Sequence, residues 1–446
     1  MGTLLRPKNG SQEQLMKPSS NLFIKLSWRF PALVGITGLM IGLKNCQAMP
    51  PLSLLSPASP PASPPAPVLS THVTPSIAAT PPSVSDRQIL QQSWTAYQQR
   101  FIQADGRVID RERKDLSTSE GQAYAMLRAV MIGDRATFDR ALQWAENNLK
   151  RQVNGKPTDS LWAWKWGQID QGKWGIIDAN FASDADVDAV TALILASRRW
   201  KHSPYLKLAR TKLKDLWTYS TIQGRDPLGK DRRYLLPGPA ASFVNQQTAQ
   251  LNPSYLAPAS FRLFAQVDPQ RDWLGLVDSS YQLLEQATAL STVALPNDWI
   301  LLDLISGQVQ PLPAPNPTGS EYAFDAYRVW WRIATDAEWF GEPRATAYLN
   351  RHLQYIQQLW QLQRSIPARI NLQGQPLVNY EALSQYGLLY AGLRLVNPAM
   401  AQQIKQQKIM PNYRNGFWDN DSAYYTQNMV WLGLMPASSM TPFLKP

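Results

Sequence analysis

The sequence predicts an all-α fold, and two observations carry this prediction. Apolar residues recur at helical spacing along most of the chain from about residue 86 to 434, and about a dozen separate helices can be recognised. Some of these segments are apolar on most faces, whereas others are amphipathic, which indicates that buried helices alternate with half-buried ones. We therefore expect two concentric layers of helices rather than a simple bundle. No internal repeat is evident.

The predicted helices lie at 87–103, 120–132, 134–149, 186–199, 204–218, 256–266, 270–290, 323–335, 344–363, 380–396, 398–408 and 421–434. The loops at 222–254 and 293–320 are long and rich in Pro or Gly. Because loops of this length in a compact domain are often functional, we expect the long loops to form a substrate groove.

The N-terminal segment 1–48 predicts an export signal. Lys17, Lys25 and Arg29 precede the apolar run 30–43, and small or polar residues around Cys46 follow it. The run is short for a permanent membrane span, so a cleaved signal peptide is favoured and an uncleaved membrane anchor is the alternative. We expect the protein to be exported, either periplasmic or secreted.

A spacer separates this signal from the folded part of the chain. Residues 49–84 contain eleven Pro and no charged residue, a composition that cannot bury a core. We therefore expect a Pro/Ser-rich linker over 49–85 and one catalytic domain over 86–446.

The residue content excludes several classes of chemistry. The chain has only three His, at positions 72, 202 and 352, and one Cys, Cys46. A Ser-His-Asp hydrolase, a His-ligated zinc enzyme and a thiolate metal site are therefore disfavoured, and we expect no metal or cofactor. Of the net charge of +11, residues 1–48 carry six Lys/Arg and one acid. The remaining excess forms no basic run, so we expect no nucleic-acid partner.

Carboxylates are thus the expected acid–base groups, and Glu120 is the first candidate. It stands at the start of the apolar helix 120–132, where Thr118 or Ser119 can cap the free backbone amides. Acidic residues are favoured in a first helical turn. Taken alone, Glu120 is therefore more often a helix-start carboxylate than a catalyst.

Two further carboxylate sites stand out. Asp184 and Asp186 open the helix that runs to Trp200, and their position also favours a capping role when it is taken alone. Asp325 and Arg328 stand three residues apart in an apolar, aromatic segment and so share a helix face. They are either one internal ion pair or a base beside a sugar site, because charged residues are rarely buried without partners.

Five ordered motifs resemble glycoside hydrolase family 8. These are Asp105–Asp110 with Thr118–Gln122, Ala182–Asp186 with the helix after it, Leu251–Pro258, Pro296–Trp299 and Tyr424-Tyr425. The family signature has Ile or Met, then Ala, where this chain has Ala189-Val190. The resemblance covers roughly residues 88–435. The pattern is most similar to the cellulases that accompany bacterial cellulose synthesis.

This resemblance implies an (α/α)6 barrel with six inner and six outer helices, and an inverting glycosidase acting on β-1,4-linked glycans. Glu120 resembles the general acid, and Asp325 resembles the general base of the cellulase-like branch. Asp184 resembles the carboxylate that holds the sugar at the cleavage subsite. Inversion requires carboxyl groups about 6.5–9.5 Å apart. Arg328 would lower the pKa of the base, whereas burial or Asp184 must raise the pKa of Glu120.

Substrate contacts are expected from Arg328, Asp186 and several aromatic residues. Trp162, Trp164 and Trp166 alternate, which would place them on one side of an extended segment. They either plug the barrel or stack on glucosyl rings, and the resemblance favours sugar contacts for Trp164 or Trp166. Tyr255 and Trp299 are further candidates.

The sequence therefore predicts an exported endo-β-1,4-glucanase that cleaves cellulose-like chains. The same machinery acting on chitosan, xylan or a mixed-linkage glucan is the enzymatic alternative. A non-catalytic glycan-binding member of a polysaccharide export system is the alternative from another class. A cellulose synthase or export complex and membrane attachment are the expected partners beyond the glucan itself.

Overall fold

The computed structural model describes residues 85–170, 172–313, 316 and 319–445. The signal predicted at 1–48 lies outside the described residues, and so does the linker predicted at 49–85 except for Ser85. Everything described belongs to one compact unit that spans Pro81–Pro446. Its first described residue, Ser85, caps the first helix by accepting from the Gln88 amide.

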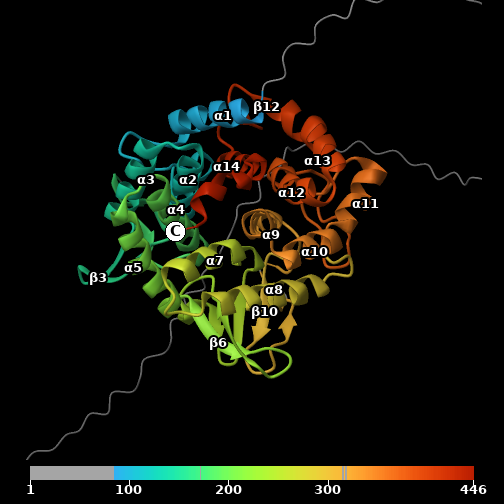
Figure 1. The fold of residues 1–446 in the computed structure, drawn as a ribbon, viewed down its shortest axis with the longest axis horizontal. Helices are drawn as coiled ribbons and strands as arrows, with labels where there is room; N and C mark the ends of the chain where they lie inside the picture. The colour runs from blue at the N-terminus through green and yellow to red at the C-terminus, as the bar shows by residue number, and fades with distance from the viewer. Residues whose placement is uncertain (1–84, 171, 314–315, 317–318, 446) are drawn as a thin grey trace, which may run out of the picture. The chain divides into compact units, whose positions relative to one another are not determined.

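An inner layer of helices lies at the centre of this unit (Figure 1). Most of their residues are buried on all sides, in keeping with their apolar sequences. The inner helices are α2 (Ser119–Ile132), α4 (Ser183–Arg199), α7 (Pro258–Val267), α9 (Tyr327–Phe340), α12 (Leu383–Val396) and α14 (Tyr424–Leu434).

The outer layer consists of helices that each precede or follow an inner one along the chain. They are α1 (Asp86–Phe101), α3 (Arg135–Asn148), α5 (Ser203–Tyr219), α8 (Trp273–Ala289), the pair α10 (Pro343–His352) and α11 (Gln354–Gln363), and α13 (Pro398–Ile404). The short α6 (Ala240–Phe243) belongs to a loop. The strict alternation of outer and inner helices confirms the predicted all-α, (α/α)6 barrel.

Contacts between the first and last inner helices close the ring. Arg128 of α2 donates through Nη1 to Asn428 Oδ1 of α14, at 3.2 Å. On the other side of α14, a Cβ at Gly433 would lie 1.9 Å from the carbonyl oxygen of Gly387 in α12. These two backbones touch directly, so a side chain at either glycine would force the helices apart.

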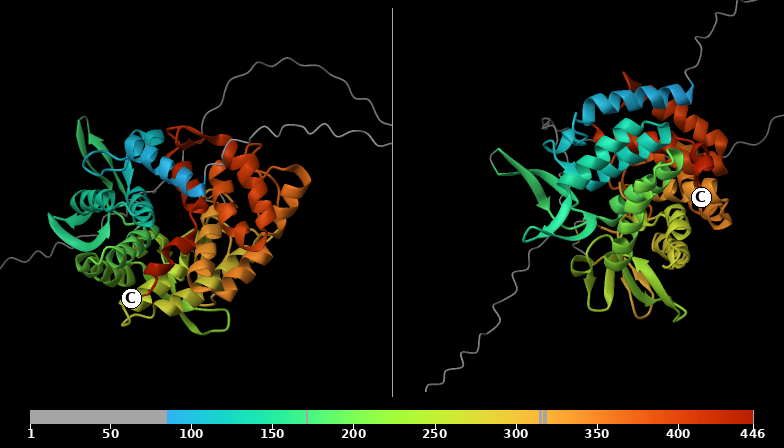
Figure 2. Two further views of the ribbon diagram at one scale, coloured as in Figure 1. Left: turned by 45° about the horizontal axis from the view of Figure 1, so that its top comes forward. Right: turned by 60° about the vertical axis from the view of Figure 1, so that its left-hand side comes forward.

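Short strands occupy the loops and were largely unpredicted. The three-stranded sheet has the order β1 (Ser117–Thr118), β4 (Lys165–Asp170), β5 (Lys173–Asp178), and the four-stranded sheet has the order β11 (Val309–Gln310), β10 (Ile300–Asp303), β9 (Thr248–Leu251), β8 (Val244–Asn245). The two-stranded sheets pair β2 (Lys150–Val153) with β3 (Lys156–Trp162), β6 (Thr221–Arg225) with β7 (Asp231–Leu235), and β12 (Tyr413–Arg414) with β13 (Phe417–Trp418). Strands β2 to β5 project from the helices (Figure 2).

Several predicted helices differ from the structure in their bounds, and two of these differences are instructive. The helix expected at 323–335 begins only at Tyr327, because the preceding residues form a turn whose amides at Ala323 and Ala326 donate to Asp298 Oδ1. The helix expected at 344–363 is interrupted at Leu353 and forms α10 and α11. Within the described ranges, no helix has the length and apolarity needed to cross a membrane.

Candidate active site

One buried guanidinium gathers the three predicted catalytic carboxylates. Arg328 donates through Nη1 to Glu120 Oε2 at 2.7 Å and to Asp184 Oδ2 at 3.0 Å. Its Nη2 donates to Asp325 Oδ1 at 2.6 Å. The carboxylates come from the start of α2, the start of α4 and the turn before α9. We call these four residues the Arg328 cluster.

Glu120 is free for chemistry because another residue caps its helix. Thr118 Oγ1 accepts from the Gly121 amide at 3.0 Å. The Glu120 side chain instead contacts Arg328 and is 25% exposed, whereas that of Arg328 is 2% exposed. The capping role that position alone favoured therefore belongs to Thr118, and a bound molecule could reach the Glu120 carboxyl.

The pKa of Glu120 is raised to about 7, mainly by burial. Arg328 opposes this rise, whereas the negative charges of Asp184 and Asp325 add to it. One cation faces three carboxylates, so full ionisation would leave two uncompensated negative charges. Retention of a proton on Glu120 removes one of them. The cluster thus overcomes the effect of the helix start, as a general acid requires.

Asp325 is held on both of its oxygens. Oδ1 accepts from Arg328, and Oδ2 accepts from Asn252 Nδ2 at 3.0 Å and from Trp299 Nε1 at 3.1 Å. The register of β9 and β10 explains this convergence: Leu251 ends β9 and lies opposite Ile300, which begins β10, so Asn252 and Trp299 meet where the two strands end. The oxygen held by Asn252 and Trp299 is thus fixed by the ends of two paired strands.

The turn that carries Asp325 is itself fixed by the buried carboxyl of Asp298. Asp298 Oδ1 accepts from the amides of Ala323 and Ala326, at 3.2 Å and 2.7 Å. Burial, followed by the charge of Asp325, raises the pKa of Asp298 well above its usual range. Asp298 and Asn252 were absent from the predicted site set, although both stand inside the motifs that carry the family resemblance.

Asp184 is buried and lies deeper than the other two carboxylates. Its side chain is 2% exposed, and its pKa is raised to about 6, mainly by burial, with Arg328 lowering it and Asp188 raising it. One helical turn along both helices, Arg332 forms a two-pronged ion pair with Asp188. Sequence reasoning missed this second pair. The i,i+4 repeat of both partners was the available signal.

The shared guanidinium limits the distance between the carboxyl groups of Glu120 and Asp325. Glu120 Oε2 and Asp325 Oδ1 bind two nitrogens of this planar group, which places these oxygens no more than about 8 Å apart. This upper limit overlaps the range of about 6.5–9.5 Å that inverting glycosidases need between their carboxyl groups. Both side chains are partly exposed, at 25% and 22%.

The predicted aromatic residues divide between two places. Tyr255 lies beside the cluster, with the Arg328 guanidinium 5.3 Å from its ring centre, and Trp299 holds Asp325. Trp164 lies next to Glu120 along the backbone contacts, because its carbonyl accepts from the amide of the preceding residue, Ser119, at 3.0 Å. Trp166 is further out and packs edge-on against Trp144.

The predicted single extended segment through Trp162, Trp164 and Trp166 is wrong. Strand β3 ends at Trp162 and β4 begins at Lys165, so the chain changes direction between them. Trp162 is buried and donates through Nε1 to Glu146 Oε1 at 2.9 Å. Trp162 is therefore a core residue. Of the three predicted indoles, only Trp164 and Trp166 lie near the sheet that leads into Glu120.

Asp186 lies in a different group from the Arg328 cluster. Its Oδ1 accepts from the Trp162 amide at 3.3 Å. Nearby, the Lys212 ammonium contacts Glu146 Oε1 at 3.0 Å and the carbonyl of Ser160 at 2.5 Å. We call Asp186, Lys212, Glu146 and Trp162 the Lys212 cluster. The structure does not bring Asp186 together with the predicted catalytic residues.

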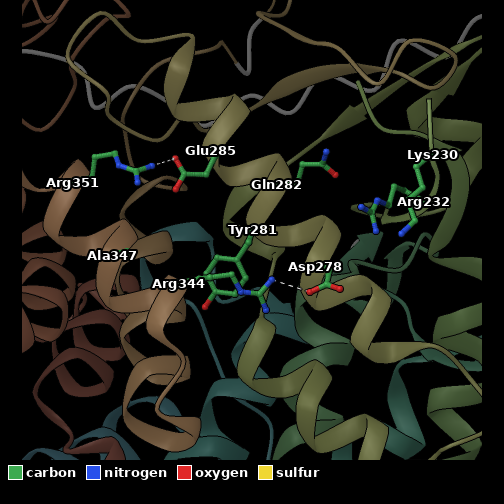
Figure 3. A pocket seen from close by; sticks show the side chains of 9 residues that line it. All are labelled: Lys230, Arg232, Asp278, Tyr281, Gln282, Glu285, Arg344, Ala347 and Arg351. Atoms are coloured by element: carbon green, nitrogen blue, oxygen red, sulfur yellow. Dashed lines mark hydrogen bonds and ion pairs between the residues drawn. The ribbon is translucent and has the colours of Figure 1, made fainter. Parts of the chain in front are cut away.

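A separate surface cleft of about 550 Å³ lies between α8 and α10 (Figure 3). Its arginines are neutralised by acids: Arg344 pairs with Asp278, and Arg351 pairs with Glu285. None of the predicted site residues lines this cleft. In the described part of the chain, no group of three or more His, Cys, Asp or Glu residues is arranged to hold a metal ion.

The fold and the carboxylate-lined site together are those of the (α/α)6-barrel class of glycoside hydrolases. The chain belongs to glycosyl hydrolases family 8, whose family model matches residues 68–430. It is 35% identical to an endoglucanase of Xanthomonas axonopodis pv. citri over 254 residues, which cover 56% of this chain and 61% of that relative. The chain thus matches less than two thirds of that relative's length.

Solved structures show the same similarity. An endo-1,4-D-glucanase from Vibrio fischeri superimposes with a TM-score of 0.63 at 25% identity, covering 77% of this chain and 93% of that chain. A family 8 endoglucanase from Klebsiella pneumoniae gives a TM-score of 0.61 at 27% identity, covering 76% and 98%. The family predicted from the five ordered motifs is therefore confirmed.

Proposed function

We propose that the protein is an inverting endo-β-1,4-glucanase acting on cellulose-like chains. The observation that carries this proposal is the Arg328 cluster, in which three carboxylates share one cation while two of them stay accessible. Relatives named endoglucanases support the glucan substrate. Two partly exposed carboxyl groups in this cluster support the proposal, because inversion uses one carboxyl group as acid and another as base.

In the proposed reaction, Glu120 gives its proton to the oxygen of the leaving sugar. A water attacks the anomeric carbon from the opposite face and passes a proton to Asp325. The bond from the anomeric carbon to the leaving oxygen breaks as the bond to the water oxygen forms, so the configuration inverts. Glu120 then regains a proton and Asp325 loses one to solvent, which restores the starting state.

The other residues of the cluster position these groups. Asp184 stands beside the acid, where its charge raises the pKa of Glu120. Its proposed role of holding the sugar at the cleavage subsite rests on the family resemblance. Arg328 fixes all three carboxylates in one geometry. Asn252 and Trp299 orient the base through Oδ2, and Tyr255 offers an aromatic face beside the guanidinium.

Two measurements on the purified protein test this proposal. The viscosity of soluble cellulose should fall long before many reducing ends appear, because internal cleavage shortens chains quickly. Proton NMR of a β-1,4 oligosaccharide digest should show the α-anomer first. A β-anomer formed first would overturn the inverting assignment. Binding without any fall in viscosity would favour the non-catalytic alternative, and a preference for chitosan, xylan or mixed-linkage glucan would change the substrate.

We further propose that the enzyme acts after export and beside the machinery that makes or exports a glucan. The basic and apolar order of residues 1–48 supports export, and a Pro-rich spacer before the barrel would let an anchored domain reach a polymer. The N-terminal sequence of protein recovered from the cell envelope and from the medium tests this. Recovery only from the cytoplasm with an intact N-terminus would contradict it.

A further inference from the structure

The sheet β1–β4–β5 runs outward from the catalytic acid. β1 leads directly into α2 and Glu120, and it pairs with β4 so that Ser117 lies opposite Trp166. β5 pairs with the other edge of β4. Neighbouring strands lie about 4.8 Å apart, so β5 is about 10 Å from β1. This sheet therefore connects the strand next to Glu120 with a strand farther from it.

Trp174 on β5 presents a large aromatic side chain at this distance. It is 43% exposed, although a Trp ring is costly to leave in water. Its ring stacks on that of Trp166, with centres 5.4 Å apart and an interplanar angle of 22°. Trp166 in turn meets Trp144 edge-on at 5.2 Å. The exposed indole is therefore the outermost member of an aromatic row that begins in the core.

A buried arginine fixes this row. The Arg107 guanidinium carbon lies 4.4 Å from the ring centre of Trp166 and 4.5 Å from that of Trp174. Arg107 also donates through Nε to Ser117 Oγ at 2.8 Å and through Nη2 to the carbonyl of Asp115. Because these contacts hold the rings before any ligand arrives, little conformational entropy would be lost on binding.

The opposite face of the same hairpin has a different character. Ile169 lies over Gly175 and Ile177 lies over Gly167, so both aliphatic chains occupy the face away from the stacked indoles. They are 54% and 43% exposed. The two faces thus expose similar fractions of apolar side chain, but only one offers a flat π surface. Such a surface accepts the C–H face of a β-linked sugar ring.

We propose that Trp174 is a distal sugar-binding platform, several sugar units away from the cleavage point, for an extended β-linked glucan chain. This inference rests on the proposed function, because it assumes that the chain bound at Glu120 continues along the sheet β1–β4–β5. The platform binds chain length rather than the reacting ring. It therefore increases affinity for long substrates and leaves the chemistry of short ones unchanged.

The test compares Trp174→Ala with Ile169→Ala across β-1,4 oligosaccharides of increasing length and soluble cellulose. Above a threshold length, kcat/KM of Trp174→Ala should fall about three- to tenfold through KM, and kcat should stay constant. Below that length it should equal the unsubstituted protein. Ile169→Ala should show no change at any length, and Trp174→Phe should recover most of the loss.

Three outcomes would overturn the platform. These are an equal loss at every length, which indicates a structural role for Trp174; an equal loss in Ile169→Ala; and no loss at all, which leaves the indole for another partner such as a protein. Failure of the proposed function is distinguishable, because the unsubstituted protein would then cleave none of these glucans. In that case calorimetric titration with the same oligosaccharides tests the platform. The proposal holds if Trp174→Ala weakens binding to long chains alone, and it fails otherwise.

Discussion

Asp184 and Asp186 are two buried aspartates in the same first turn of α4, yet they belong to different clusters. Two residues along a helix are rotated by about 200°, so their side chains point to opposite sides. Asp184 meets Arg328, whereas Asp186 meets the amide of Trp162. No side-chain hydrogen bond caps this helix at its N-cap residue, Ala182. Helical rotation, rather than residue type or burial, thus places one aspartate in the Arg328 cluster and the other in the Lys212 cluster.

The cations of the two clusters differ in the same sense. The planar Arg328 reaches three carboxylates with two nitrogens, whereas Lys212 is a compact charge that contacts Glu146, a carbonyl and the face of Trp162. Glu120 and Glu146 are each 25% exposed. The two clusters therefore offer matched pairs of substitutions. Comparing the two members of a pair separates an effect on the reaction from an effect on the fold.

The largest expected difference is in turnover. Glu120→Gln keeps the shape of the side chain but removes the transferable proton, so kcat on soluble cellulose should fall on the order of 10³-fold or more. Glu146→Gln should keep kcat within a few-fold. Reducing-sugar release measures both. Comparable rates in the two variants would contradict the assignment of Glu120 as the acid, and retained glucan binding by Glu120→Gln controls for folding.

Removal of each cation should come next. Arg328→Met and Lys212→Met both leave buried carboxylates without their partner, which costs about 3 kcal/mol or more of unfolding free energy. Urea denaturation followed by circular dichroism measures this loss. Only Arg328→Met should also abolish turnover at temperatures where it is folded. An active Arg328→Met protein would show that the shared guanidinium is dispensable.

The alkaline limb of activity distinguishes two carboxyls whose pKa values are both about 7. Glu120 must be protonated to act, so kcat/KM should fall roughly tenfold per pH unit above about pH 7. Asp186 also has its pKa raised to about 7, by burial. In Asp186→Asn, kcat/KM should therefore still fall above about pH 7. If this fall disappears in the variant, the titrating group is Asp186 rather than Glu120.

The last expected effect concerns the pH dependence of stability. The pKa of folded Asp186 lies above its unfolded value of 3.8, so its contribution is complete below about pH 4 and is lost as pH rises through about 7. Asp186→Asn cannot ionise. Its Tm should therefore decline less than that of the unsubstituted protein between pH 4 and 8. Parallel Tm curves from thermal melts would show that Asp186 does not titrate in this range.

Much of the fold follows from local sequence patterns. The inner helices are predictable because buried segments such as 120–132 are apolar on most faces, and this property needs no knowledge of distant residues. The strands were missed because pieces as short as Ser117–Thr118 carry no pattern of their own. The turn before Tyr327 was read as helix because its anchor, Asp298, is remote in sequence.

The sequence predicted which residues belong to the site better than it predicted the contacts among them. Spacing linked Arg328 only to Asp325, three residues away, whereas its bonds to Glu120 and Asp184 depend on how the barrel closes. The role of Asn252 depends on strand register, which the sequence does not display. The separation of Asp184 from Asp186 is different, because helix geometry alone contains it.

The bonds of Arg328 have a consequence for the order in which the molecule forms. Its partners Glu120 and Asp184 precede it by 208 and 144 residues. Contacts across such separations close large loops and form late, after local helices are established. The centre that carries out the reaction therefore exists only once the N-terminal and C-terminal halves of the barrel have met. A chain released with either half incomplete would be largely helical and yet inert towards the polymer.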